Sequence, residues 1–320
     1  MTSWLRVAVG WAVALAAMTP ALAAYPDKPV RVLVPYAAGG ANDQVARFMA
    51  GELQQRFGQP FVVENRPGAG GVVGMTALRQ ADPDGYTIAI GEPGSVTINP
   101  QLTKTPPYAP REDFIPLAMA GQVPLIVISH PAAGITSLAG LKAYGERNNV
   151  AYGSAGHGTV QHLTMELLRD SLGMNLTHVP YRGGAPALND LVGGQIPLLP
   201  ITVPTALPHI KAGTVTPVAA LSRERSRHLP DLATAGEQGY PSVNVTIWLG
   251  FFAPAGTPAE IVDRLSEAMQ AVLANPAAQQ KLADLGVDVV PMNRAQFVDL
   301  IDADITRWGD IIQSRQIVAQ

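Results

Sequence analysis

The stretch VRVLVPYAAGGANDQVARFMAGELQQRFG, residues Val30 to Gly58, decides the fold. Val30–Tyr36 is rich in β-branched residues and ends at a proline, a pattern that predicts a buried strand. From Asn42 to Phe57, apolar residues recur every three or four positions, which predicts an amphipathic helix that Asn42 or Asp43 caps and Gly58 ends. Between strand and helix lie two alanines and two glycines, which leave backbone amides accessible at the start of the helix.

The same alternation of strand and helix continues along the chain. Strands are expected at residues 60–65 and 86–91 with a helix at 72–81, and the order strand, glycine-rich loop, helix returns at Val150–Gly173. Further strands are expected at 175–181 and 215–221, with a loop and helix between them. Because such units build parallel sheets with right-handed crossovers, the sequence predicts an α/β fold with two lobes.

The chain is expected to cross between the lobes twice. Asp113–Pro131 and Val243–Pro258 are extended runs without helical periodicity, and three amphipathic helices follow the second run. The predicted lobes are residues 25–124 with 247–320, and residues 125–246. Two crossings form a hinge, and ligands favour the cleft between hinged lobes.

The first 24 residues differ from the rest. Arg6 is their single charge, an apolar run follows it, and ALA at Ala21–Ala23 is typical of a cleavage site. We expect an exported protein whose signal peptide is cleaved near Ala23 or Ala24, which places the mature protein in the periplasm. Loss of Arg6 changes the net charge from −3 to −4, so nucleic acid is not an expected partner. The chain has no cysteine, which excludes disulfides and thiolate metal ligands.

The glycine-rich loops predict anion binding. A helix N-terminus has free N–H groups and carries a partial positive charge of roughly half an electron, and glycine lets a ligand approach the backbone. AAGGAND (37–43) and YGSAGHGT (152–159) both have this arrangement, and RPGAGG and RGGAPA follow neighbouring strands. Two such sites facing each other across a cleft suggest a ligand with two anionic ends, although tight turns alone would also explain each loop.

Other kinds of site have weaker support. GAGGVVG (Gly68–Gly74) resembles a dinucleotide fingerprint without matching it, so an exported enzyme that binds a phosphate-bearing ligand remains an alternative. Tyr152 stands where a nucleophile elbow needs glycine, so no catalytic residues are predicted. His157 and His162 are five residues apart and would not share a helix face, so no metal site is predicted. No cofactor is expected.

A series of motifs resembles the substrate-binding proteins of tripartite tricarboxylate transporters, the Bug family. They are YPDKPVRVLVPYAAGGANDQVAR, VVENRPGAGG, DPDGYT, INPQL, YGSAGHGT, HVPYRGGAPALNDLVGGQI, ALPHIKAG and FFAPAGTP, in order over nearly the whole mature chain. The resemblance implies a two-lobed periplasmic binding protein of the Venus-flytrap, type II-like class with two crossover strands. It also implies a small carboxylate ligand, a membrane permease as partner, and no catalysis. We expect a monomer.

The resemblance also indicates candidate ligand-binding residues, because family ligands are held by amides and hydroxyls of the two leading loops. With the flanking positions, the candidates are Tyr36, Ala38, Gly39, Gly40, Ala41, Asp43, Gly70, Ser154, Ala155, Gly156, His157, Gly158, Thr159, Ile201 and Thr202. The sequence leaves open whether Arg66 and Arg182 contact the ligand.

Two departures from the family pattern bear on the ligand. Ala41 stands where the family often has a hydroxyl residue, and Pro197 and Ile201 replace two acidic residues. Without the acid at Ile201, this wall of the cleft is expected to be apolar apart from Thr202, and a buried polar ligand group there would lack a partner, at a cost of ~1–3 kcal/mol. We therefore expect a dicarboxylate with an apolar or aromatic body, such as terephthalate. A sensor that reports the same ligand to a membrane receptor is a further alternative.

Overall fold

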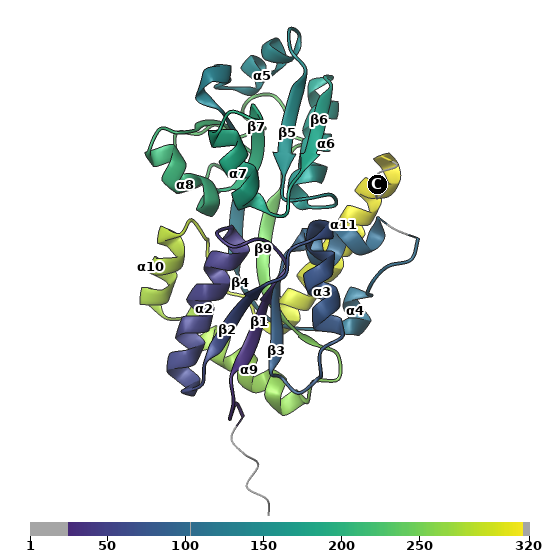
Figure 1. Cartoon of the computed structure of the whole chain (residues 1–320), viewed down its shortest axis with the longest axis vertical. Coiled ribbons are helices and arrows are strands. Elements are labelled where there is room, and N and C mark those ends of the chain that lie inside the picture. Colours follow the sequence, from purple (N-terminus) through teal and green to yellow (C-terminus); the bar gives the residue numbers. More distant parts are fainter. Residues whose placement is uncertain (1–24, 103, 316–320) are drawn as a thin grey trace, which may run out of the picture.

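The computed structural model describes residues 25–102 and 104–315. The expected signal peptide, residues 1–24, lies outside the described residues. Within the described part of the chain, none of the helices combines the length and the hydrophobicity that a bilayer-spanning segment needs. Figure 1 shows two α/β lobes stacked along the long axis of the molecule, which confirms the predicted fold class.

The first lobe is built on the stretch that opens with Val30. Strand β1 (Val30–Val34) is followed by helix α2 (Ala41–Phe57), and β1 pairs in parallel with β2 (Phe61–Asn65) and β3 (Thr87–Gly91). Helix α3 (Val72–Arg79) connects β2 to β3, as expected for a parallel strand–helix–strand unit. Val45, Met49 and Leu53 form the apolar face of α2, and all three side chains are fully buried.

Two long antiparallel strands join the lobes. Strand β4 (Phe114–Ser129) pairs with β9 (Thr246–Pro254) as far as Pro124, and from Leu125 onward it pairs with strands of the second lobe. Strand β9 also pairs antiparallel with β3, so the sheet of the first lobe is mixed rather than wholly parallel. The predicted lobe boundary at 124/125 falls where β4 changes partners, and it stays a prediction.

The second lobe repeats the architecture of the first. Parallel strands β5 (Val150–Ser154) and β6 (Leu176–Pro180) lie beside β7 (Leu198–Thr202), and the strand order through both lobes is β2-β1-β3-β9-β4-β7-β5-β6, with β8 (Thr216–Ala220) also on β4. Its helices are α5 (Leu138–Gly145), α6 (Val160–Leu172), α7 (Gly184–Val192) and α8 (Val203–Lys211).

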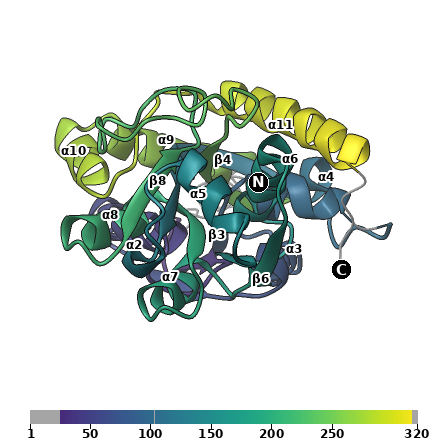
Figure 2. The ribbon, with the colours of Figure 1, turned by 90° about the horizontal axis from the view of Figure 1, so that it is seen from above.

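The last three helices return to the first lobe, as the sequence predicts. They are α9 (Ala259–Leu273), α10 (Pro276–Asp284) and α11 (Arg294–Arg315). Helix α9 packs against α2 and β4, and α11 packs against β4. Figure 2 shows α11 running along one side of the molecule. Short helical segments complete the chain at Ala69–Gly71, Gly94–Ile98, Asn99–Gln101, Pro110–Asp113 (α4) and Pro131–Ala133.

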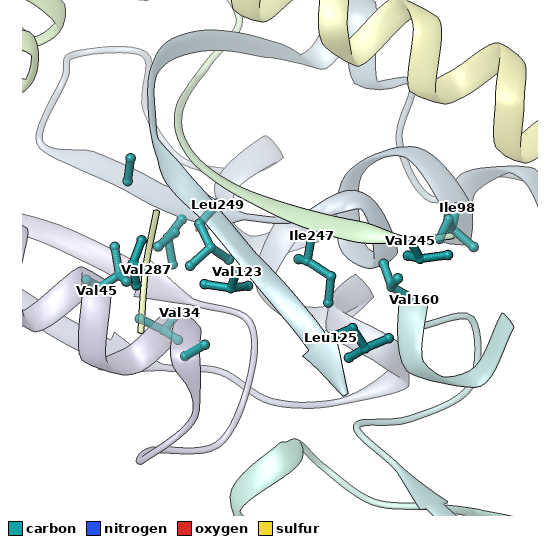
Figure 3. Packing of buried hydrophobic residues seen from close by; sticks show 14 of the residues in the cluster. Val34, Val45, Ile98, Val123, Leu125, Val160, Val245, Ile247, Leu249 and Val287 are labelled. Atoms are coloured by element: carbon teal, nitrogen blue, oxygen red, sulfur yellow. The ribbon is translucent and has the colours of Figure 1, made fainter. Parts of the chain in front are cut away.

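The hydrophobic core runs through both lobes along the crossing strands. Figure 3 shows Val123, Ile247 and Leu249 of these strands between residues of the first lobe and residues of the second. Leu125 and Val160 belong to the same cluster, and all five side chains are fully buried. Burying a side chain of this size contributes roughly 1.5–3 kcal/mol, so the hinge strands are anchored in a continuous core.

Candidate functional site

The loop after β1 leads directly into the N-terminus of α2. The N-cap residue is Gly40, and α2 begins at Ala41, so the expectation that Asn42 or Asp43 caps the helix is wrong. Asp43 lies in the first turn instead and reaches back, accepting a hydrogen bond from the Gly39 amide at 2.9 Å. With glycine as N-cap, the start of α2 has no capping side chain and its first turn is open to a ligand.

Asp43 braces this loop. Besides the Gly39 amide, its carboxylate accepts hydrogen bonds from Asn65 Nδ2 at 2.9 Å and from Arg47 Nε at 3.0 Å. Burial alone would raise its pKa, but the hydrogen bonds from Arg47, Gly39 and Asn65 outweigh burial and lower it. Asp43 therefore stays ionised at neutral pH and fixes the backbone of Gly39 and Gly40.

The loop after β5 is closed by its own side chains. The Thr159 hydroxyl donates to Gly156 O at 2.7 Å, and Ser154 Oγ donates to the same carbonyl at 3.0 Å. Thr159 is also the N-cap of α6, where its side chain accepts from the His162 amide. Both hydroxyl protons are therefore used inside the loop, whereas the sequence had suggested them as donors to a ligand.

The two lobes touch through these loops. The Ala37 amide donates to Arg182 O at 3.1 Å, and Asn99 Nδ2 donates to Gly158 O at 3.1 Å. Gly70, with a φ of +61°, faces the second loop so closely that a Cβ atom there would lie 2.1 Å from His157 O. These contacts across the hinge show that the lobes are closed against each other.

A small cavity with polar and apolar walls lies between the closed lobes. Its walls are formed by Tyr36, Gly40, Ala41, Asn42, Glu92, Ala155, Gln161, Gly184, Ile201, Thr202 and Thr205. Four helices contribute residues from their first turn or N-cap, namely α2, α6, α7 and α8. Because each helix N-terminus carries a partial positive charge and free N–H groups, their convergence makes this cavity suited to an anion.

Glu92 gives the cavity a titratable group. It is 2% exposed, it follows β3, and Asn42 Nδ2 lies 3.5 Å from its Oε2 atom. Burial raises the pKa of the Glu92 carboxyl to about 7. Burial and the neighbouring Glu92 also raise the pKa of Tyr36, whose hydroxyl donates to Gly70 O at 3.2 Å. At neutral pH, Glu92 can therefore be present in its neutral form and donate a hydrogen bond.

Two residues that line the cavity carry unsatisfied hydrogen-bond acceptors in the described part of the chain. Among the described residues, Asn42 Oδ1 and Gln161 Oε1 are buried without a hydrogen-bond partner, and they belong to opposite lobes. A buried polar atom left unpaired costs about 1–3 kcal/mol, so a bound water that donates to both would favour the closed form.

The structure separates the predicted site residues into two groups. Tyr36, Gly40, Ala41, Ala155, Ile201 and Thr202 line the cavity. The other nine lie around it: Asp43 in the first turn of α2, Ser154 at the end of β5, and Ala38, Gly39, Gly70, Gly156, His157, Gly158 and Thr159 in the segments between strand and helix. The sequence left open whether two arginines contact the ligand. In the structure Arg66 forms an ion pair with Glu64, and the Arg182 carbonyl takes part in the contact between the lobes.

Five further residues line the cavity that the sequence did not single out as ligand-binding: Asn42, Glu92, Gln161, Gly184 and Thr205. The expectation of a wall that is apolar apart from Thr202 is therefore too simple, because Thr205 and Gln161 are also polar. The sequence did contain signals for three of them. Asn42 and Gln161 lie in the expected first turns of helices that follow glycine-rich loops, and Glu92 is a charged residue directly after an apolar strand.

Comparisons with known proteins identify the family. Residues 45–317 match the profile described as tripartite tricarboxylate transporter family receptor. The chain belongs to this family. The relative BugT of Bordetella pertussis (strain Tohama I) is 34% identical over 292 residues, which cover 90% of this chain and 90% of BugT. Members of this family are substrate-binding receptors and not enzymes, and they are periplasmic.

Two solved structures with ligands are similar to this chain over almost their whole length. Rpa4515 of R. palustris with adipate has a TM-score of 0.88 and 32% identity, covering 92% of this chain and 99% of that one. MatC (Rpa3494) from Rhodopseudomonas palustris with bound malate has a TM-score of 0.86 and 33% identity, covering 90% and 100%. The membership confirms the predicted receptor class and excludes the alternative of an exported enzyme.

Proposed function

We propose that this receptor captures a small dicarboxylate in the cavity between its lobes and delivers it to a tripartite tricarboxylate-type permease. The observation that carries the proposal is the convergence of four helix N-termini on one cavity between the closed lobes. The protein would be exported, cleaved near Ala23 or Ala24, and act as a monomer. Similar receptors were solved with adipate and with malate, which are both dicarboxylates.

One carboxylate would bind at the start of α2. The backbone N–H groups of Gly40, Ala41 and Asn42 lie at the uncapped end of that helix, and the neutral form of Glu92 can donate to the same carboxylate. The second carboxylate would bind near the first turns of α6 and α8, where Thr202 Oγ1 and Thr205 Oγ1 lie 3.1 Å apart. The dipoles of these helices favour negative charge at both ends.

The body of the ligand would pack against Ile201. This side chain is 1% exposed, and the position of a Cβ atom on Gly184 lies 3.8 Å from Ile201 Cδ1. Ala155 extends the same apolar patch from the neighbouring loop. We therefore propose a dicarboxylate with an apolar or aromatic body, such as terephthalate, whose two charged ends reach the polar walls.

Capture requires the lobes to separate. The free space in the closed cavity, measured for the centre of a water molecule, is about 20 Å³, which corresponds to about one water. A dicarboxylate would therefore enter an open form and hold the lobes in a wider closed form by contacting both.

A panel of carboxylates tests the proposal. The melting temperature of the purified protein is measured with adipate, terephthalate, malate, citrate, glutamate, benzoate and NAD, since ligand at a hundredfold excess over Kd stabilises the folded state by about 2.7 kcal/mol. We expect rises with adipate and terephthalate and a smaller rise with benzoate. A rise with malate, citrate or glutamate alone would contradict the apolar body, and a rise with NAD alone would contradict the receptor.

Two substitutions at one position refine the test. Ile201→Asp should weaken terephthalate and adipate relative to ligands that carry hydroxyl or ammonium groups. The control Ile201→Val keeps an apolar surface and should leave the ranking unchanged. An unchanged ranking in Ile201→Asp would show that the body of the ligand does not contact this wall.

A further inference from the structure

Three histidines meet in the second lobe behind the loop of residues 154–159. His157 belongs to this loop, His162 lies in the first turn of α6, and His178 lies in the middle of β6. One nitrogen of each ring lies within 4.8 Å of a nitrogen of each other ring. The spacing of His157 and His162 therefore does not decide against a metal site, because His157 precedes α6 and a third histidine comes from the edge strand.

The rings are close enough to share one ion. The ring centroids are 4.1 Å apart for His162 and His178, 4.7 Å for His157 and His178, and 5.4 Å for His157 and His162. In a tetrahedral zinc site with Zn–N bonds of about 2.0–2.1 Å, ligand nitrogens lie about 3.4 Å apart. The His162 and His178 rings are stacked, so side-chain rotations that turn the rings and shorten the separations from up to 4.8 Å to about 3.4 Å would complete a three-histidine site.

His178 already has the hydrogen bond that orients a metal ligand. Its Nε2 atom lies 2.6 Å from Ser154 Oγ, and that hydroxyl has Gly156 O as an acceptor for its own proton. The His178 Nε2–H group can therefore donate to Ser154, which leaves a lone pair on Nδ1. Among the described residues, His178 Nδ1 is buried and has no hydrogen-bond partner. Metal-bound histidines have this arrangement, with one nitrogen held by a partner and the other on the ion.

The charge state of the cluster also suits a metal. Burial, together with the neighbouring histidines, lowers the pKa of His162 to about 4 and that of His178 to about 3. Neutral imidazole is the form that binds transition metals. The nearest carboxylate on α6, Glu166, accepts from the Tyr152 hydroxyl at 3.0 Å and pairs with Arg169, so a water molecule would complete the coordination.

We propose that His157, His162 and His178 form a binding site for a divalent transition metal of the Zn²⁺ class. Three imidazoles and an open fourth position are typical of zinc coordination. Because His157 and Ser154 belong to the loop that contacts Gly70 and Asn99 of the first lobe, a bound ion would fix this loop to α6 and β6. The site is separate from the carboxylate cavity and does not depend on the proposed ligand.

Calorimetric titration with Zn²⁺ tests the site. The purified protein, without a polyhistidine tag and treated with a chelator, should bind one Zn²⁺ per chain, and His162→Gln and His178→Gln should each weaken binding at least tenfold. The control His209→Gln removes a histidine of α8 that lies outside the cluster, and it should bind as the unsubstituted protein does. Failure to bind at 1 mM Zn²⁺, which means a Kd well above that concentration, or equal binding by all variants, would overturn the proposal.

A second measurement covers the case in which the buried substitutions impair folding. Crystals of the unsubstituted protein soaked in Zn²⁺ should show anomalous scattering within about 2.0–2.2 Å of a nitrogen of each of the three histidines. The loop variant His157→Gln should fold with an unchanged melting temperature in chelator and lose the stabilisation by Zn²⁺. An anomalous peak elsewhere, with none at the three rings, would overturn the proposal.

Discussion

The loops that precede α2 and α6 are both glycine-rich and lie between a strand and a helix, but their structures differ. The first ends in Gly40, has no capping side chain, and opens its helix N-terminus to the cavity. The second is closed by Thr159 and Ser154, whose hydroxyls both bond to Gly156 O, and it presents Ala155 to the cavity. The comparison shows that a glycine-rich loop before a helix can leave the helix N-terminus open to a cavity or can be closed by hydrogen bonds from its own hydroxyl groups.

The largest expected effect comes from the point where the loops touch. In Gly70→Ala, the new methyl group would lie 2.1 Å from His157 O of the second lobe in the closed form, and 2.8 Å from the Asn99 side chain of its own lobe. If the closed form fell to about 1% of the population, affinity for the best dicarboxylate would fall about 100-fold.

The matched control for this substitution is Gly134→Ala. Gly134 has a similar φ of +66°, and a Cβ atom there would meet nothing within 4 Å. Both variants carry the same backbone strain, so calorimetry should find reduced affinity in Gly70→Ala alone. Equal affinities would show that closure through this contact is not needed for binding.

The second effect concerns the acid beside the first loop. Because burial raises the pKa of Glu92 from 4.5 to about 7, its neutral form stabilises the fold below pH 4.5, and this contribution is lost as the pH rises through 7. The free energy of unfolding should fall by about 2 kcal/mol between pH 5 and pH 7 relative to Glu92→Gln.

Ligand affinity should follow the same titration. The ionised form of Glu92 repels a carboxylate at the start of α2, so affinity should decline between pH 6 and pH 8 in the unsubstituted protein and stay level in Glu92→Gln. Denaturant melts and calorimetry across this range measure both quantities. Parallel pH profiles of the two proteins would mean that Glu92 does not titrate in the folded state.

The smallest effect tests the rigidity of the second loop. Thr159→Val removes the N-cap of α6 and the hydrogen bond to Gly156 O, at a cost of about 1 kcal/mol in stability. The Ser137 side chain caps α5 by accepting a hydrogen bond from the Gly140 amide at 3.0 Å. Ser137→Ala removes this cap and should lower stability by about the same amount.

The two cap variants should differ in binding. We expect a loss of ligand affinity of a fewfold in Thr159→Val, because the loop that contacts the first lobe becomes less ordered, and no loss in Ser137→Ala. Calorimetry at a temperature where both variants are fully folded separates stability from binding. An equal loss in both variants would assign the effect to stability alone.

The sequence predicts the first lobe well because its signals are local. The apolar period of α2 places that helix within one residue of its observed start, and β1, β2 and β3 carry clear apolar runs. The segment that forms β7 and α8 was not predicted as strand and helix. Pro200 lies within β7 and Pro208 within α8, and proline disfavours both the interior of a strand and that of a helix. Pairing with β4 overrides this local preference.

The site is less predictable because it depends on tertiary contacts. Gly40, Ala41 and Ala155 follow from the glycine-rich loops, but Glu92 enters the cavity only because β3 lies beside β1. The three histidines are separated by up to 21 positions and meet because β6 lies beside β5, the strand that leads into the loop and α6. A contact of this kind cannot be predicted from the periodicity of the sequence.

The central claim is that the uncapped start of α2 receives one carboxylate of the ligand between closed lobes. The most direct measurement is a crystal structure of the protein with the dicarboxylate that raises its melting temperature most. We predict carboxylate oxygens within about 2.7–3.2 Å of backbone nitrogens among Gly40, Ala41 and Asn42, with the second carboxylate near the first turns of α6 and α8. A ligand bound between the lobes without contact to the α2 amides would contradict the account.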